Sequence, residues 1–318
     1  MGPNPADHAP FCSTELSRQR FVAAAMTMNV LVNPGGGSAA EDPLPPVREA
    51  LSGQDVAVER VEGPDLAHRV EELIAEGATC IVAAGGDGTI SAVAGALSGT
   101  DVALGILPLG TLNHLARDLN IPFNLDEAAA ILRSGERRSI DIAEVNDRPF
   151  VNNSAIGLYP LMVIDRESQQ HRLGRSKRLA MLVAGVRTLA RFRHYRLLLR
   201  INGTETDRED TPLLFVGNND YRLDLAAPGC RDRLDDGRLS VFVMRKKTRL
   251  GMFAAMIRAL FNRPSDDDMI RLDDVQTLEV RSRRTPLTIS IDGETLPLPA
   301  PLRYKILPKA LTVIAPRA

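Results

Sequence analysis

The segment GGDGT, residues 85–89, combines the bare backbone of a phosphate-binding loop with one carboxylate, Asp87. Two similar segments lie on either side of it in the chain, NPGGGS at 33–38 and PLGTLN at 108–113. A sharp loop that follows a parallel strand and opens into a helix points backbone N–H groups at an anion. One such loop is more often a plain tight turn. Three in succession, each ending in Ser, Thr or Asn, indicate a phosphate site.

The phosphate site would be built without basic side chains, because residues 83–112 contain no Lys or Arg. The Walker-type phosphate-binding motif GxxxxGK[ST] is absent, and the dinucleotide-binding motif G-x-G-x-x-G does not occur at the first strand. Backbone N–H groups, Thr89 and Thr111 would have to hold the phosphates, with the help of a metal ion. An ionised Asp87 beside a triphosphate needs a cation or a proton between them. Asp87 would therefore help to hold Mg²⁺ or accept a proton from a substrate hydroxyl; the alternative is a structural helix cap.

A second pair of carboxylates, Asp292 and Glu294, lies in the segment IDGE at 291–294. A hydroxyl is a poor nucleophile at neutral pH, so a carboxylate within hydrogen-bond reach can act as its general base. The alternative is a plain β-turn with solvated acids. If both motifs face one cleft, Asp87 would serve phosphate and metal, Glu294 would serve the hydroxyl, and Asp292 would orient or support it.

The elements that must position these residues alternate between Met28 and about Asp141. Apolar runs predict strands at 28–34, 55–61, 78–84 and 101–107, and helical patterns lie between them. This alternation indicates a mostly parallel sheet covered on both faces. Each glycine-rich loop leaves the carboxyl end of a predicted strand, so all three could gather along one edge of one sheet.

The pattern then changes to strands with turns. Residues 137–157 predict two strands joined at Asn146-Asp147, and a long helix is predicted over about 163–193. Further strand-like segments lie at 194–203, 211–219, 237–244, 276–282, 286–294, 303–308 and 310–316. We expect a tail at 1–28, a nucleotide-binding α/β domain at 29–144 completed by 304–318, and a β-rich substrate domain at 145–303.

Bulk properties exclude some classes of protein. The net charge of −1 gives no electrostatic case for binding nucleic acid. Cys12, Cys80 and Cys230 form no metal-binding spacing, which favours reduced thiols in a cytoplasmic protein. The longest purely apolar run, 179–186, is too short for a membrane span.

Two basic segments favour peripheral contact with an anionic membrane. Residues 166–200 hold ten Lys or Arg and one acid, and residues 245–263 hold six and none. The second segment also places apolar residues at helical spacing, as an amphipathic surface helix does: Leu250, Phe253, Ile257, Leu260 and Phe261. The alternative is a buried apolar face with a solvated basic one. A homodimer is left open.

Taken in order, the motifs resemble bacterial diacylglycerol kinase-like lipid kinases, which are similar to diacylglycerol, sphingosine and ceramide kinases. The resemblance rests on GGDGT (85–89), PLGTLNHLARDLNIP (108–122), NNSAIGLYP (152–160), FVGNNDYR (215–222), RLDDGRLSV (233–241) and IDGE (291–294). GGDGT alone is shared with NAD kinases and 6-phosphofructokinase relatives, whereas its combination with GTLN and a late DGE is specific.

This resemblance implies an ATP site between an α/β nucleotide domain and a β-sandwich-like lipid domain, and phosphorylation of a lipid hydroxyl. It implies Glu294 as proton acceptor beside Asp292, and a structural Mg²⁺ held by Asp236 with the carbonyls of Arg233 and Arg238. The nucleotide would be lined by Asn33, Pro34, Gly35, Gly36, Gly37, Gly85, Gly86, Asp87, Gly88, Thr89, Thr111 and Asn113.

The chain departs from the family pattern at Val61, Ser91, Ala92 and His114. These departures bear on the nucleotide contacts and on the exact lipid more than on the reaction class. We therefore expect an ATP-dependent lipid kinase with a diacylglycerol-like substrate. The alternatives are an NAD-kinase-like or other soluble-substrate kinase, and a degenerate nucleotide-binding module that senses lipid without catalysis.

Overall fold

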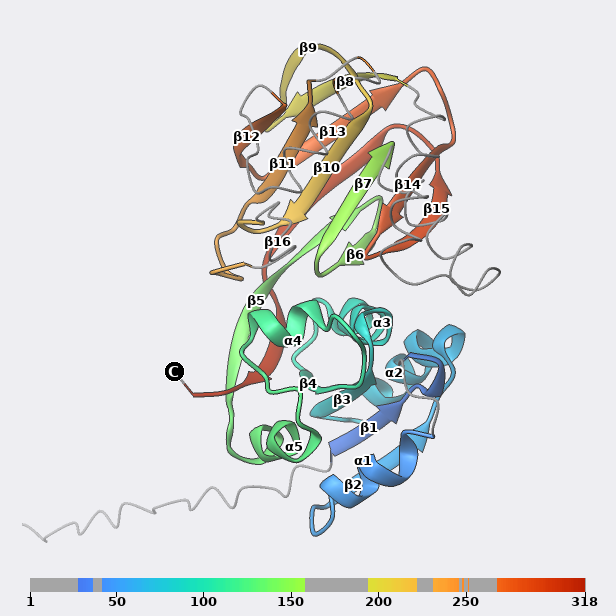
Figure 1. Ribbon diagram of the computed structural model, residues 1–318, viewed down its shortest axis with the longest axis vertical. Coiled ribbons are helices and arrows are strands. Elements are labelled where there is room, and N and C mark those ends of the chain that lie inside the picture. The colour runs from blue at the N-terminus through green and yellow to red at the C-terminus, as the bar shows by residue number, and fades with distance from the viewer. Residues whose placement is uncertain are drawn as a thin grey trace, which may run out of the picture.

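The computed structural model describes residues 28–36, 42–157, 194–221, 231–245, 248, 251 and 268–317. These residues form an N-terminal lobe of helices around a sheet and a C-terminal lobe of strands, joined by two long strands (Figure 1). Several predictions fall outside the described residues: the tail before Met28, Gly37, the helix at 163–193 and most of the basic segment 245–263.

The N-terminal lobe is built on four parallel strands in the order β2-β1-β3-β4. Every residue of β3 and β4 is buried, as continuous apolar runs covered on both faces of a parallel sheet should be. The strands are β1 (Met28–Val32), β2 (Val56–Arg60), β3 (Cys80–Gly85) and β4 (Ala103–Pro108). The helical segments are η1 (Pro34–Gly36), α1 (Leu44–Ala50), η2 (Gly63–Asp65), α2 (Leu66–Ala75), α3 (Asp87–Leu97), α4 (His114–Asp118) and α5 (Leu125–Ser134).

Helix boundaries differ from the sequence pattern at three places. Helix α3 begins at Asp87, inside the GGDGT loop that was expected to precede it, and α4 is a short helix of only His114–Asp118 after the PLGTLN loop. Helix α5 had no counterpart in the prediction. Its signal was present, because Asn124 lies three residues before Glu127 and its side chain accepts a hydrogen bond from the Glu127 N–H at 3.1 Å.

The C-terminal lobe is a sandwich of two sheets. Its first sheet continues the N-terminal sheet through β16, β13, β8 and β9, and its second has the order β12-β11-β10-β7-β14-β15. Apolar residues from both sheets, such as Leu199, Val280, Val216 and Ile289, share one core. The strands are β5 (Glu136–Val145), β6 (Arg148–Phe150), β7 (Asn153–Gly157), β8 (Tyr195–Ile201), β9 (Thr204–Thr211), β10 (Leu213–Asn218), β11 (Leu239–Met244), β12 (Met269–Val275), β13 (Thr277–Ser282), β14 (Leu287–Ile291), β15 (Glu294–Leu298) and β16 (Leu302–Ala315).

Strands β5 and β16 form an antiparallel ribbon that runs through both lobes (Figure 1). The C-terminal end of β16 pairs in parallel with β4, and its N-terminal end pairs with β13. The sequence predicted two strands here, at 303–308 and 310–316. That prediction was wrong, because the break is a bulge inside one strand, with Lys309 at φ 53°.

Asp141 of β5 holds this bulge. Its carboxylate is buried and accepts the Lys309 N–H at 2.8 Å and the Gly237 N–H at 2.7 Å. The side chain therefore fixes the ribbon where it passes from one lobe to the other. It also ties the ribbon to the loop that precedes β11.

The predicted fold class is confirmed: an N-terminal α/β lobe is followed by a β-sandwich-like lobe. Among the described residues, no helix has both the length and the apolar character needed to cross a membrane.

Candidate active site

The three glycine-rich loops gather along one edge of the N-terminal sheet, as expected. Strands β1, β3 and β4 are adjacent and parallel, so their carboxyl ends lie side by side. Residues 33–36, 86–89 and 109–113 follow these ends directly. Pro34, Gly35 and Gly36 form the short helix η1, and Thr111 is exposed in the loop after β4.

Hydrogen bonds between side chains join the first loop to the second. The Asn33 Nδ2 donates to Thr89 Oγ1 at 2.9 Å, and Asn33 Oδ1 accepts the Gly35 N–H at 3.0 Å. Both Asn33 and Thr89 are buried. These two residues therefore hold the loops together beneath the surface at which a phosphate would bind.

Asp87 joins the second loop to the third. Its Oδ2 accepts the Asn113 N–H at 2.9 Å, and its Oδ1 accepts the His114 N–H at 2.6 Å. The carboxylate thus satisfies free N–H groups at the start of α4. Asn113 has the left-handed conformation, with φ 48°, and its amide bonds Gly110 N (3.0 Å) and Gly110 O (2.8 Å).

Glycine is required at two positions by close approach. A Cβ atom on Gly110 would lie 2.6 Å from the Gly86 Cα, so any larger residue would push the second and third loops apart. A Cβ atom on Gly85 would lie 2.4 Å from Thr89 Oγ1. The bare sequence of these loops therefore reflects how tightly they pack against one another.

The IDGE segment forms the turn between β14 and β15. Asp292 (φ 45°) and Gly293 (φ 91°) both have positive φ, as the central residues of a type I′ hairpin turn do. The Asp292 carboxylate accepts three backbone N–H groups, from Val151 (2.9 Å), Asn152 (2.8 Å) and Asn153 (3.0 Å). Asp292 therefore fixes the turn against the segment between β6 and β7.

The pKa of Asp292 is raised above its usual value, because burial penalises the charged carboxylate; the three N–H donors act in the opposite direction. The Ser91 hydroxyl of α3 also lowers the pKa of Asp292. Its oxygen is buried and has no hydrogen-bond partner within 3.5 Å among the described residues. Ser91 thus lies beside the turn from the other lobe.

Glu294, two residues after Asp292, lies against the GGDGT loop. A Cβ atom on Gly88 would be 3.9 Å from Glu294 Oε1. Unlike Asp292, Glu294 is exposed. The structure therefore brings together two motifs that lie about two hundred residues apart in the chain.

A buried ion pair that the sequence reasoning missed ties α4 to the second lobe. Arg231 lies 2.7 Å from the Asp118 carboxylate, and the two side chains are 0% and 2% exposed. Arg231 also donates to Val151 O and to Asn152 Oδ1. Burial raises the pKa of Asp118, and Arg231 opposes this shift. No spacing rule links residues 118 and 231, so the sequence alone offered no signal.

The candidate metal loop, residues 233–238, is held both by Asp141 of β5, which accepts the Gly237 N–H, and by Asn219. The Asp236 N–H donates to Asn219 Oδ1 at 3.0 Å. The Asp236 carboxylate lies 3.3 Å from Arg233 Nε and 3.9 Å from Arg238 Nη2. Over the described part of the chain, no three His, Cys, Asp or Glu residues are grouped closely enough to hold a metal ion. A cation here would depend on one carboxylate, backbone carbonyls and water.

Family comparisons cover both lobes. The model for the "Diacylglycerol kinase catalytic domain" matches residues 27–145, and that for the "YegS C-terminal NAD kinase beta sandwich-like domain" matches residues 162–315. A solved "putative diacylglycerol kinase" from Bacillus anthracis has a TM-score of 0.70 at 22% identity, covering 91% of this chain and 97% of that one. At that identity the likeness shows the fold.

Sequence relatives extend the match over most of the chain. A "Probable lipid kinase YegS-like" from Chromohalobacter salexigens is 29% identical over 86% of this chain and 89% of its own length. An uncharacterized Synechocystis protein is 30% identical over 77% of this chain, but the match spans only 57% of that longer protein. A "Diacylglycerol kinase" from Mycobacterium tuberculosis is 30% identical over 83% of this chain and 86% of its own length. The chain therefore belongs to the diacylglycerol kinase-like family of lipid kinases.

Proposed function

We propose that this protein transfers the γ-phosphoryl group of ATP to the hydroxyl of a diacylglycerol-like lipid, at the junction of its two lobes. The position of Glu294 Oε1 against Gly88 carries the proposal, because it places a free carboxylate at the mouth of the phosphate loops. Phosphoryl transfer depends on positioning and on stabilisation of charge, and a carboxylate held against phosphate-binding loops can contribute to positioning.

The phosphates of ATP would lie on backbone N–H groups at the N-terminus of α3. Asp87 need not repel them, because its carboxylate oxygens face the N–H groups of Asn113 and His114. These two N–H donors offset part of the negative charge that Asp87 brings to the loop. The remaining lone pairs of Asp87 can accept hydrogen bonds from water, including water bound to Mg²⁺.

Glu294 would act as general base. The lipid hydroxyl gives its proton to the Glu294 carboxylate, its oxygen forms the new bond to the γ-phosphorus, and the bond from that phosphorus to ADP breaks. Asp292 does not contact the substrate in this scheme. Its three N–H partners hold the turn, and the turn aims Glu294 at the GGDGT loop.

Mg²⁺ has two proposed roles, at the ATP phosphates near Asp87 and at the 233–238 loop. Asp236 and the carbonyls of Arg233 and Arg238 would supply oxygen ligands, which Mg²⁺ prefers. The Arg233 side chain is 63% exposed, so it can move away from Asp236 without leaving a buried charge. A cation at this loop would stabilise the second lobe and would not touch ATP.

Peripheral contact with an anionic membrane would give the active site access to its lipid. Its support is the two basic segments of the sequence, most of which lie outside the described residues. A soluble-substrate kinase would need no such surface. Turnover of ATP with extracted lipids, with NAD and without an acceptor would separate the lipid kinase from both alternatives.

The Glu294→Gln variant should lower kcat by roughly 10²-fold or more, because the amide cannot accept the hydroxyl proton. The KM for ATP and the melting temperature should stay close to wild type, since Glu294 is exposed. Lipid phosphorylation and ATP KM would be measured side by side, with Glu136→Gln, an exposed acid at the start of β5, as the matched control. Near-full kcat in Glu294→Gln would show that Glu294 is not the general base, and Asp292 and Asp87 would then be tested in its place.

The Asp87→Asn variant should lose both stability and ATP affinity. An amide places an N–H group against the N–H of Asn113 or His114, at a cost of about 1–3 kcal/mol. It also removes the charge that would balance Mg²⁺. Urea unfolding without nucleotide and the KM for ATP would be compared with Asp101→Asn, an exposed control. Unchanged unfolding contradicts the link between loops, and an unchanged KM contradicts the role in ATP binding.

The Asp236→Ala variant tests the structural cation. Wild type should melt at a higher temperature in Mg²⁺ than in EDTA, and Asp236→Ala should abolish this difference. Asp235→Ala, in the same loop, should keep it. A Mg²⁺ effect that survives in Asp236→Ala would show that these residues form only a turn.

Flotation with phosphatidylglycerol vesicles tests the membrane contact. Binding should weaken as salt is added, because each basic residue near an anionic surface contributes about 1 kcal/mol of screened attraction. Vesicles of phosphatidylcholine are the control. Binding that does not respond to salt would contradict the electrostatic proposal.

A further inference from the structure

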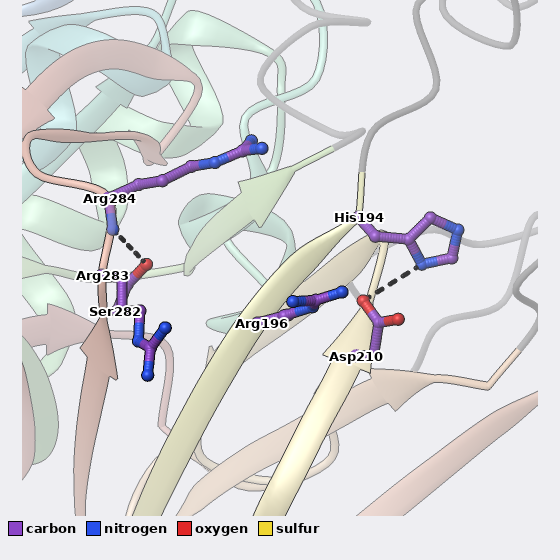
Figure 2. Close-up of a pocket in the computed structure, with 6 residues that line it drawn as sticks. All are labelled: His194, Arg196, Asp210, Ser282, Arg283 and Arg284. Atoms are coloured by element: carbon purple, nitrogen blue, oxygen red, sulfur yellow. Dashed lines mark hydrogen bonds and ion pairs between the residues drawn. The ribbon is translucent and has the colours of Figure 1, made fainter.

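A cavity of about 670 Å³ opens in the C-terminal lobe, lined by His194, Arg196, Asp210, Ser282, Arg283 and Arg284 (Figure 2). Three neighbouring strands, β13, β8 and β9, and the residues directly before β8 and after β13 supply this lining at one end of the sheet. Arg196 of β8 is the cross-strand partner of Asp210 of β9, and Ser282 of β13 is opposite Leu197 of β8. The strand pairing thus brings residues from three parts of the chain to one place.

The cavity has an excess of positive charge. Arg196, Arg283 and Arg284 form no ion pair within 4.0 Å among the described residues, whereas other arginines, such as Arg69 and Arg271, pair with acids. The one lining carboxylate, Asp210, lies 3.4 Å from His194 Nδ1 (Figure 2). Three guanidinium groups against one carboxylate leave the lining with a net charge of about +2 when His194 is neutral.

This charge selects a class of ligand. Guanidinium groups present a rigid fork of N–H donors that matches phosphate oxygens, and Ser282 adds a hydroxyl. The described residues that line the cavity are all polar or charged, and the stems of the arginines add apolar surface. Its volume falls within the range of small-molecule sites. We propose that this cavity binds a phosphate group, carried either by an anionic phospholipid headgroup or by a free phosphate.

The cavity is separate from the proposed phosphoryl-transfer site. Arg284 lies three residues before β14, and Glu294 lies three residues after it. The five-residue strand between them spans roughly 15 Å of extended chain. A phosphate held by Arg284 therefore cannot be the group on which Glu294 acts. The inference goes beyond the proposed function and does not depend on it.

The test compares three double variants. Arg283→Gln with Arg284→Gln removes two forks, and Arg283→Lys with Arg284→Lys keeps the charge but loses bidentate geometry. Arg48→Gln with Arg133→Gln removes the same charge from exposed positions on α1 and α5. In one arm, calorimetry follows titration with inorganic phosphate. In the other, co-sedimentation uses vesicles of phosphatidylcholine and phosphatidic acid at a 4:1 ratio, with pure phosphatidylcholine as blank.

We expect the glutamine pair at 283 and 284 to lose at least about tenfold in affinity in one of the two arms, which identifies the source of the phosphate. The lysine pair should lie between it and wild type, and the 48 and 133 control should change less than about twofold. Wild-type binding by the glutamine pair in both arms would overturn the proposal. An equal loss in the control would also overturn it, since only net charge would then matter.

Activity separates this proposal from the lipid kinase assignment. With detergent-solubilised diacylglycerol, the glutamine pair at 283 and 284 should keep wild-type turnover, because neither arginine belongs to the proposed active site. Absence of lipid phosphorylation in the wild type would count against the proposed function and leave the binding result intact.

Discussion

The whole arrangement depends on one ribbon of two antiparallel strands, β5 and β16, which both lobes share. A candidate base on one lobe and phosphate loops on the other are useful only if their separation is fixed to within an ångström or so. A flexible linker could not do this, whereas a β-ladder that continues through both sheets can. The bulge at Lys309 lets the ribbon turn between the lobes, and the Asp141 carboxylate defines that bend by accepting the Lys309 N–H.

Buried or partly buried carboxylates recur wherever separate segments must meet. Asp87 holds two loops, Asp141 holds the ribbon and a turn, and Asp292 holds the hairpin that carries Glu294. Each accepts backbone N–H groups, which suit a buried carboxylate because they are fixed in place and carry no counter-charge that must itself be desolvated. The Asp118–Arg231 pair is the costlier solution, since burial of two charges rarely gives net stability. Its value is that Arg231 reaches Val151 and Asn152, and so links α4 to the segment that holds Asp292.

The fold class, most strands and the gathering of the three loops could be predicted from the sequence, because periodicity and glycine-rich turns are local signals. The sequence predicted roles for GGDGT and IDGE in one site only on the condition that both face one cleft, because no local signal links segments so far apart. It assigned Asp87 to ATP and metal without foreseeing that Asn113 and His114 would occupy its oxygens. Asp141 and the Asp118–Arg231 pair carried no pattern at all. Their roles arise from tertiary pairing, and the same is true of β16, where a bulge looked like a turn between two strands.

The shared strand also constrains how the chain can fold. Val313 pairs with Leu104 of β4, about two hundred residues earlier, and Leu302 pairs with Val280 of β13. The sheet of the first lobe is therefore complete only after β16, about two hundred residues further along the chain, has been synthesised. Contacts so distant in sequence pay a large loop-closure entropy and form slowly. The edge of β4 stays open during that interval, so newly made chains need protection from edge-to-edge association until β16 arrives. The two lobes should then become ordered in a single cooperative step, because β16 belongs to the sheets of both.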